Sequence, residues 1–227
     1  MGVGESMTLQ GTVNKTGFLL LCVTVSAAWT WGLARSESPA AAAPWMIGGL
    51  VGGFIVALVT IFKKEWSPFT SPIYALLEGL ALGGISSFLD QRFPGIAIHA
   101  VALTFGTLAV MLFAYTSGLI RATQKFKIGV IAATGGIVVV YVIDIVLRFF
   151  GMHVPLINDS GPWGIAISLF IVGVAALNLI LDFDFVETGV QEHAAKYMEW
   201  YGAFGLMVTL IWLYLEMLRL LSKLQRR

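Results

Sequence analysis

Seven long apolar stretches take up most of the 227-residue chain. A helix that crosses the hydrocarbon core of a bilayer needs about 20 mostly apolar residues, and each stretch has roughly that length. The predicted spans are residues 16–34, 42–62, 68–89, 94–120, 127–151, 162–185 and 199–221. Charged residues make up 12% of the chain, whereas a soluble domain has about 25%. The sequence therefore predicts an all-α integral membrane protein, a bundle of seven transmembrane helices.

The domain organisation follows from these spans. Residues 1–15 are predicted to form a polar N-terminal tail, residues 16–221 the seven-helix transmembrane domain, and residues 222–227 a basic C-terminal tail. Prolines that can start a helix stand at or near the beginning of the second, third, fourth and sixth spans. Glycines four residues apart allow two helices to approach closely. Such pairs are Gly48 and Gly52, Gly49 and Gly53, and Gly79 and Gly83.

Lys and Arg residues predict the orientation, because cytoplasmic loops carry an excess of them. The loops on the N-terminal side hold seven of these cations and those on the opposite side hold three, which favours a cytoplasmic N-terminus. The four cations near the C-terminus disagree with this orientation if all seven spans cross. Either this tail is tolerated outside, or the last segment is re-entrant. We favour seven full spans.

Glu78 is the most deeply embedded acid. It lies ten residues into the third span, about 15 Å from its start and so near the bilayer midplane. Ionisable residues in a span are costly and are candidates for function. Two interpretations stay open: a neutral Glu78 that donates a hydrogen bond to a neighbouring carbonyl group, or a site for protons or cations.

Two further acids are each followed by an arginine within one helical turn. Asp144 precedes Arg148 by four residues, and Glu216 precedes Arg219 by three, so each pair shares one helix face. We favour an ion pair near a helix end in both cases. A role in a pore is the alternative for all four side chains.

The stretch LNLILDFDFVETGVQEHAAKYMEW, residues 177–200, concentrates carboxylates where the sixth span ends. Its acids are Asp182, Asp184, Glu187, Glu192 and Glu199. Negative charge is unfavourable at the C-terminus of a helix, and neighbouring carboxylates hinder each other's ionisation. The cluster could therefore change its protonation near neutral pH and attract cations at a pore mouth. Asp182 and Asp184 are weak candidates to hold Ca²⁺, which prefers oxygen ligands. A solvated acidic loop is the alternative.

Other classes of function lack a signal. The chain contains no GxSxG, HExxH or phosphate-loop motif, so we expect no enzyme. Its net charge is +1 and no basic stripe is present, so we expect no nucleic-acid partner. No cofactor is predicted, apart from Ca²⁺ as a permeant ion.

Three segments carry a resemblance to a known family: the glycine-rich third span (EGLALGGISS), the aspartate ending the sixth span (LNLILDFDF) and the closing helix (WLYLEMLRLLSKL). With its seven apolar spans, the chain resembles the Bax inhibitor-1/YccA family, also called the transmembrane Bax inhibitor motif family, over about residues 15–223. The resemblance implies six helices around a central seventh, and a cation leak, chiefly of Ca²⁺, that responds to pH. We expect an integral, multi-pass protein of a bacterial inner (cytoplasmic) membrane.

In that family a carboxylate on the sixth helix pairs with one on the seventh. The resemblance assigns Asp182 to the first position, and alignment on the closing LRLL places Thr209 at the second. Glu216 is 17 residues beyond Glu199, about 25 Å along the helix, and so too far from Asp182. We therefore expect Asp182 to pair with Glu199 or Asp184.

These observations predict a pH-sensitive cation (Ca²⁺) leak channel, controlled by protonation of carboxylates at the end of the sixth helix and the start of the seventh. One alternative is a proton-coupled transporter that uses Glu78, which helix breaks at residues 83–84 and 135–136 would support. The other is a non-transport regulator that binds a membrane protease or another membrane complex. The expected partners are the lipid bilayer, Ca²⁺ and protons and, in the last case, a membrane protein.

Overall fold

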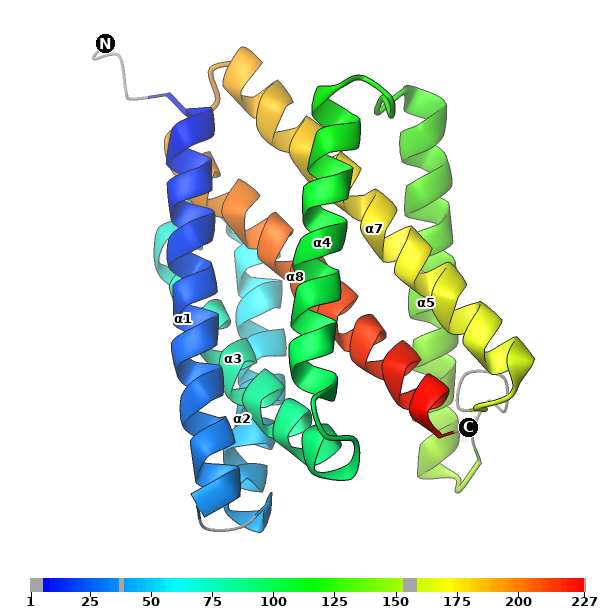
Figure 1. Cartoon of the computed structure of the whole chain (residues 1–227). Helices are drawn as coiled ribbons and strands as arrows, with labels where there is room; N and C mark the ends of the chain where they lie inside the picture. Colours follow the sequence, from blue (N-terminus) through cyan, green and yellow to red (C-terminus); the bar gives the residue numbers. More distant parts are fainter. Residues whose placement is uncertain (1–5, 37–38, 153–158, 227) are drawn as a thin grey trace. The chain divides into compact units, whose positions relative to one another are not determined.

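A computed structural model describes residues 6–36, 39–152 and 159–226, and these residues form seven long helices (Figure 1). Each helix is long and apolar enough to cross a membrane, which confirms the predicted all-α membrane fold. The elements are α1 (Leu9–Ser36), α2 (Pro39–Phe62), the short 3₁₀ helix η1 (Lys64–Trp66), α3 (Ser67–Arg92), α4 (Ile96–Thr116), α5 (Gln124–Phe149), α7 (Pro162–Gln191) and α8 (Met198–Gln225). Because α8 is one continuous helix of 28 residues, about 42 Å long, it need not be re-entrant.

The ends of several helices differ from the sequence prediction. Helix α1 begins at Leu9 rather than at residue 16, because the Thr8 hydroxyl accepts a hydrogen bond from the Gly11 N–H (3.0 Å) and caps the helix. Helix α4 ends at Thr116 rather than at residue 120, because Gly118 turns the chain with a φ of +74°. Helix α7 continues to Gln191 instead of ending at residue 185. Much of the acidic stretch is therefore helical rather than a loop.

Three of the four prolines begin helices as predicted. Pro39 and Pro162 are the first residues of α2 and α7, and Pro68 is the second residue of α3. Proline suits these positions because the first N–H groups of a helix have no intrahelical partner. Pro94 instead lies in the turn before α4.

The helices form two compact units. The first contains α1, α2, η1 and α3, together with the end of α7 from Asp184 and the start of α8 up to Val208. The second contains α4 and α5, α7 up to Phe183, and α8 from Thr209. Helices α7 and α8 therefore contribute to both units.

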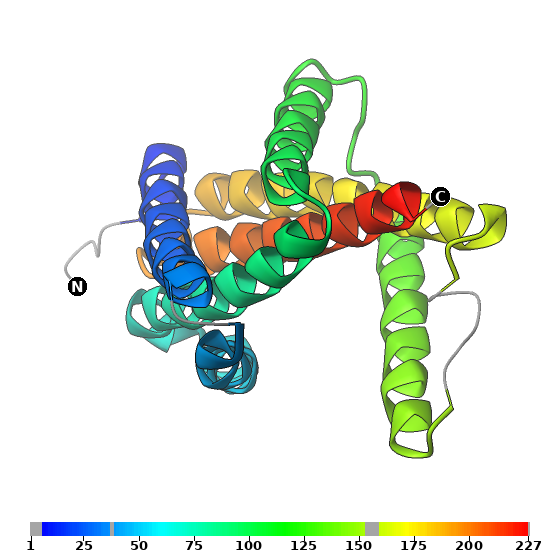
Figure 2. The ribbon, with the colours of Figure 1, turned by 60° about the horizontal axis from the view of Figure 1, so that its bottom comes forward.

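Close glycine contacts hold the first unit together. Helix α3 packs against both α1 and α2 (Figures 1 and 2). A Cβ atom on Gly83 would lie 2.2 Å from the carbonyl oxygen of Ala27 in α1, and one on Gly49 would lie 2.4 Å from that of Leu77 in α3. These contacts confirm the prediction that glycines bring helices together, although Gly48 faces open space.

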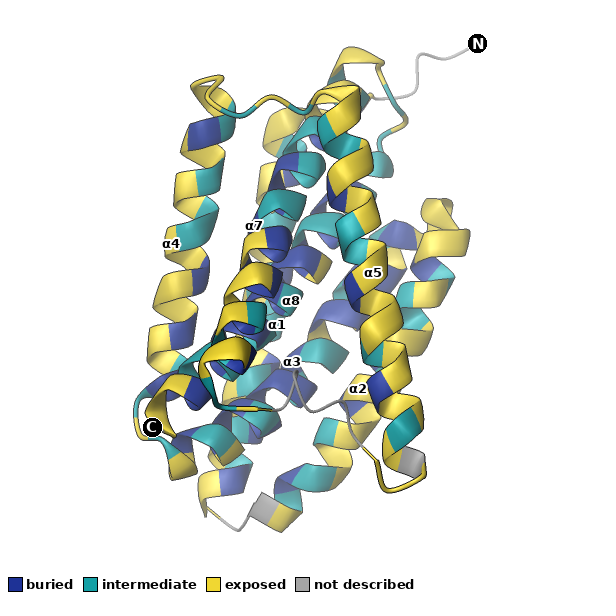
Figure 3. Cartoon of the chain, turned by 90° about the vertical axis from the view of Figure 1, so that its right-hand side faces the viewer, coloured by how far each residue is buried: buried dark blue, intermediate teal, exposed yellow. Residues whose placement is uncertain are grey.

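In the second unit, apolar side chains of α5, α7 and α8 form a core. Ile137 of α5 packs with Ile171 and Val174 of α7, and Trp212 of α8 covers them. Elsewhere α4 and α5 are largely exposed (Figure 3). Their exposed residues include large apolar ones such as Phe113, as expected of helices that contact lipid.

Burial distinguishes α3, α7 and α8 from the other helices. Half of the most apolar window (50%) is buried in each of these three, against 17–22% in α1, α2, α4 and α5. The central position of the last helix stays a prediction, because α3 and α7 are buried to the same extent as α8.

Candidate functional site

Asp182 has an unpaired oxygen atom between helices. The residue as a whole is partly exposed, but its Oδ2 atom is buried and has no hydrogen-bond partner among the described residues. Thr209, a buried residue of α8, lies close enough to the Asp182 carboxyl group for its hydroxyl to interact with it. An ionised carboxylate in such a place is costly. Asp182 is therefore best stabilised by a proton or a cation at Oδ2.

Thr209 is a different partner from those that we expected for Asp182. Thr209 lies ten residues after Glu199, about 15 Å further along α8. Asp184 is two positions from Asp182 and so projects from another face of α7. Thr209 is also the residue at which the resemblance described above would place the second carboxylate. At this place α7 contributes a carboxyl group and α8 a hydroxyl group.

Asn178, one turn before Asp182 on α7, is a polar residue that the sequence analysis missed. Its amide nitrogen donates hydrogen bonds to Oγ1 of Thr134 in α5 (2.8 Å) and to the carbonyl oxygen of Val174 (2.9 Å). The available signal was an asparagine four residues before an embedded aspartate in an otherwise apolar helix. Asn178 and Asp182 thus place two polar side chains on successive turns of α7.

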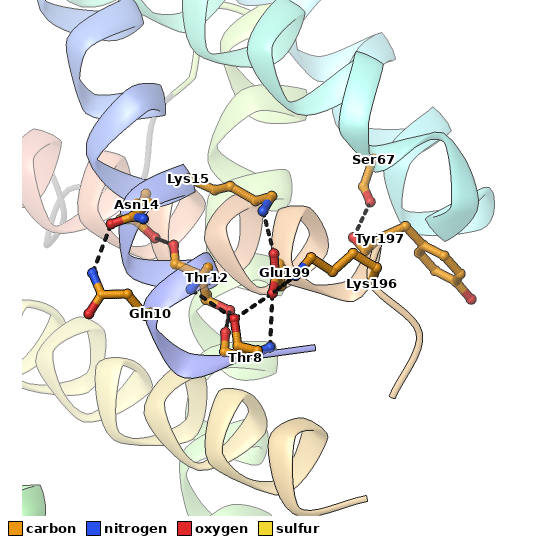
Figure 4. A network of polar contacts seen from close by, with 11 residues as sticks. Thr8, Gln10, Thr12, Asn14, Lys15, Ser67, Lys196, Tyr197 and Glu199 are labelled. Atoms are coloured by element: carbon orange, nitrogen blue, oxygen red, sulfur yellow. Dashed lines mark hydrogen bonds and ion pairs between the residues drawn. The ribbon is translucent and has the colours of Figure 1, made fainter. Parts of the chain in front are cut away.

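Glu199 lies in the first unit, at the centre of a separate network (Figure 4). Its side chain is fully buried. Oε1 accepts hydrogen bonds from the Thr8 N–H (2.9 Å) and hydroxyl (2.7 Å) and pairs with Nζ of Lys196 (3.2 Å). Oε2 forms an ion pair with Lys15. The carboxylate is therefore satisfied by two cations and by the N-terminus of α1.

Residues 6–15, here called the N-terminal strap, lie on the turn that joins α7 to α8. Ser6 forms an antiparallel bridge with Ala195, and the Met7 N–H donates to the Ala194 carbonyl oxygen (2.7 Å). A Cβ atom on Gly11 would lie 2.2 Å from Oε1 of Glu199, so a glycine leaves room for this carboxylate. These residues were predicted to form a polar tail. The local sequence does not reveal their partners, which lie at the far end of the chain.

Glu78 lies on α3 opposite a glycine of α2. A Cβ atom on Gly53 would lie 2.6 Å from Oε1 of Glu78, so the glycine makes room for the partly exposed carboxyl group. Helix α3 runs unbroken through residues 83–84, and α5 runs unbroken through residues 135–136. The helix breaks that would support a transporter are therefore absent from these two helices.

The two arginine–carboxylate pairs form as the spacing predicts. Nε of Arg148 lies 2.8 Å from Oδ2 of Asp144 in α5. In α8, NH1 of Arg219 lies 2.9 Å from Oε1 of the buried Glu216. The hydroxyl of Tyr141 in α5 also donates to this oxygen (2.6 Å), and the Arg219 guanidinium lies over the Tyr141 ring (4.8 Å). This triad joins α5 to α8.

Replacing Tyr141 with phenylalanine should lower the stability of the protein by about 1–2 kcal/mol, because buried Glu216 loses a hydrogen bond that is assisted by its charge. Thermal unfolding in detergent measures the change. Tyr197→Phe is the matched control, because the structure gives the Tyr197 hydroxyl no partner among the described residues. Equal melting temperatures for the two variants would contradict the prediction.

The remaining acidic candidates lie on the last turns of α7. Asp184 is partly buried, and exposed Glu187 accepts a hydrogen bond from the Gln191 amide (3.3 Å). Within the described part of the chain, no three His, Cys, Asp or Glu side chains come together as a metal site. Binding of Ca²⁺ by Asp182 and Asp184 stays a prediction.

The fold and the site define a multi-pass helical membrane protein that holds carboxyl groups between its spans. The chain belongs to the Bax inhibitor 1 like family, whose model matches residues 2–226. This match confirms the resemblance seen in the sequence. Neither the curated proteins nor the solved structures gave a significant match.

Proposed function

We propose that the protein is a pH-sensitive leak channel for cations, chiefly Ca²⁺, and that Asp182 is its protonation site. The observation that carries the proposal is the buried Oδ2 atom of Asp182, which has no hydrogen-bond partner among the described residues. A proton or a cation supplies what this atom lacks. Membership of the Bax inhibitor 1 like family agrees with the proposal.

The contact between Asp182 and Thr209 is the proposed gate. When Asp182 is protonated, the neutral carboxyl group is tolerated between α7 and α8, and the Thr209 hydroxyl holds it. When Asp182 loses its proton, one hydroxyl group cannot compensate the charge. Water or a cation then enters, and the contact between the two helices loosens. Carboxylate and hydroxyl oxygens are ligands that suit Ca²⁺.

On this mechanism, leak should rise with pH, because the ionised carboxylate attracts the cation. With the N-terminus in the cytoplasm, as we propose from the Lys and Arg residues, the turn between α7 and α8 also lies on the cytoplasmic side, since the N-terminal strap contacts it.

The decisive test is Ca²⁺ flux into liposomes that contain the purified protein, at pH 6, 7 and 8. We expect wild-type flux to increase with pH. Asp182→Asn, which fixes a neutral side chain of the same shape, should hold the flux near its pH 6 value throughout. Glu192→Gln is the matched control, because Glu192 is exposed on the turn after α7 and should leave the profile unchanged.

Two results would overturn the proposal. If Asp182→Asn retained both the flux and its pH dependence, Asp182 would not be the sensor. If wild-type protein gave no flux above empty liposomes at any pH, the isolated chain would not be a channel. Regulation of a membrane partner would then be the better hypothesis.

A further inference from the structure

We propose that Asn178 is a second binding position on the cation pathway, where its amide oxygen coordinates the ion next to Asp182. This inference rests on the proposed function and extends it to a residue that influences ion selectivity. It starts from the hydrogen bonds that fix the orientation of the Asn178 amide group.

The orientation follows from the chemistry of the partners. The atom of the Asn178 amide that lies 2.9 Å from the Val174 carbonyl oxygen must be the nitrogen, because a carbonyl oxygen only accepts. The same nitrogen donates to Oγ1 of Thr134 (2.8 Å). Both amide hydrogens are thereby used. The Oδ1 atom is left as an acceptor, and no donor to it is seen among the described residues.

Asn178 and Asp182 lie close together on one face of α7. They are four residues apart, so their Cβ atoms are separated by about 5–6 Å. Both residues are partly exposed, whereas Leu179 and Ile180 between them are fully buried. Asn178 is thus accessible from the surface of the unit, and the buried Oδ2 atom of Asp182 lies one helical turn further along α7.

The two groups without a hydrogen-bond partner among the described residues are both oxygen acceptors. A neutral amide oxygen beside a carboxylate favours the binding of a cation and disfavours that of an anion. A neutral oxygen also binds a cation more weakly than a carboxylate does. Conduction needs such successive sites, at which binding is strong enough to admit the ion and weak enough to release it.

A purely structural role makes a different prediction. Hydrogen bonds between polar side chains commonly join membrane helices, and the bond from Asn178 to Thr134 joins α7 to α5. If that were the whole role of Asn178, its loss would lower thermal stability without changing which ions pass. Ion selectivity therefore separates the two roles.

The test measures Ca²⁺ and Na⁺ flux in parallel in liposomes, for wild type, Asn178→Leu and Asn178→Asp. Loss of one oxygen contact should lower Ca²⁺ flux about tenfold in Asn178→Leu. Asn178→Asp adds a negative charge at the same place and should raise the ratio of Ca²⁺ to Na⁺ flux. An unchanged ratio in Asn178→Asp, with wild-type flux in Asn178→Leu, would overturn the inference.

If the Asn178→Leu variant does not fold, Thr134→Val is the alternative variant. It removes the hydrogen bond that holds the Asn178 amide group but changes no residue of α7. We expect it to lower the Ca²⁺ to Na⁺ ratio. Thr104→Val is the matched control, since within the described part of the chain the Thr104 hydroxyl bonds only to a carbonyl oxygen of its own helix, that of Ala100 (2.8 Å). The same ratio in both threonine variants and wild type would count against the inference.

The failure of this inference differs from failure of the proposed function. If Asp182→Asn abolishes the pH response but the Asn178 variants conduct as wild type, the channel stands and Asn178 is only structural. If wild-type protein does not conduct at all, both proposals fall together.

Discussion

Replacing Glu199 with alanine should lower the stability of the protein by about 3 kcal/mol, which corresponds to a fall of roughly 6–12 °C in melting temperature for a chain of this length. The fully buried carboxylate is the shared partner of Lys15, Lys196 and Thr8. Its removal leaves Lys15, whose side chain is only 19% exposed, without this counter-charge. It also leaves the start of α1 without its acceptor. Thermal unfolding in detergent measures the loss.

A control and a compensating variant sharpen this test. Glu192→Ala removes an exposed acid seven positions earlier and should leave the melting temperature nearly unchanged. Combining Lys15→Met with Glu199→Gln replaces the buried ion pair by neutral groups, and should cost less than Glu199→Ala because the more buried of the two cations is removed together with the carboxylate. If the Glu199→Ala and Glu192→Ala variants had the same melting temperature, the network around Glu199 would contribute no stability.

The second large effect is expected at Gly83 in α3. Any side chain there would place its Cβ 2.2 Å from the carbonyl oxygen and 2.8 Å from the Cα atom of Ala27 in α1. Both are backbone atoms, so α1 itself would have to move. Gly83→Ala should cost about 1–3 kcal/mol as an overpacked contact, and Gly83→Val should leave little folded protein. Size-exclusion profiles and melting temperatures measure both.

Gly129 in α5 is the matched control, because a Cβ atom there meets nothing within 4 Å. Gly129→Ala should raise stability by about 0.5–1 kcal/mol, the ordinary gain from alanine in a helix. The same substitution thus has opposite signs at the two positions. A higher melting temperature for Gly83→Ala would show that α1 and α3 do not approach as closely as described.

Features with a local cause could be predicted from the sequence. The seven helices follow from their apolar length, and the pairs Asp144–Arg148 and Glu216–Arg219 follow from their spacing on one helix. The sixth span was predicted to end at residue 185, whereas α7 continues to Gln191. No proline interrupts it, and its carboxylates are compatible with a helix.

Features that join distant segments could not be predicted in the same way. Nothing near Glu199 indicates that its partners are Thr8 and Lys15. Tyr141 completes the Glu216 pair from another helix, and no periodicity reveals this. Thr209 was not expected as the partner of Asp182, and its place beside the Asp182 carboxyl group required the fold.

The N-terminal strap also sets an order of events in biosynthesis. Thr8 and Glu199 are 191 residues apart, so at roughly 5–20 residues per second the strap leaves the ribosome some 10–40 s before its carboxylate partner. During that interval Met7, Thr8 and Lys15 have no partner from α8. Closure of the strap therefore requires that the start of α8 has been synthesised, and a nascent chain stalled before Glu199 cannot form these contacts.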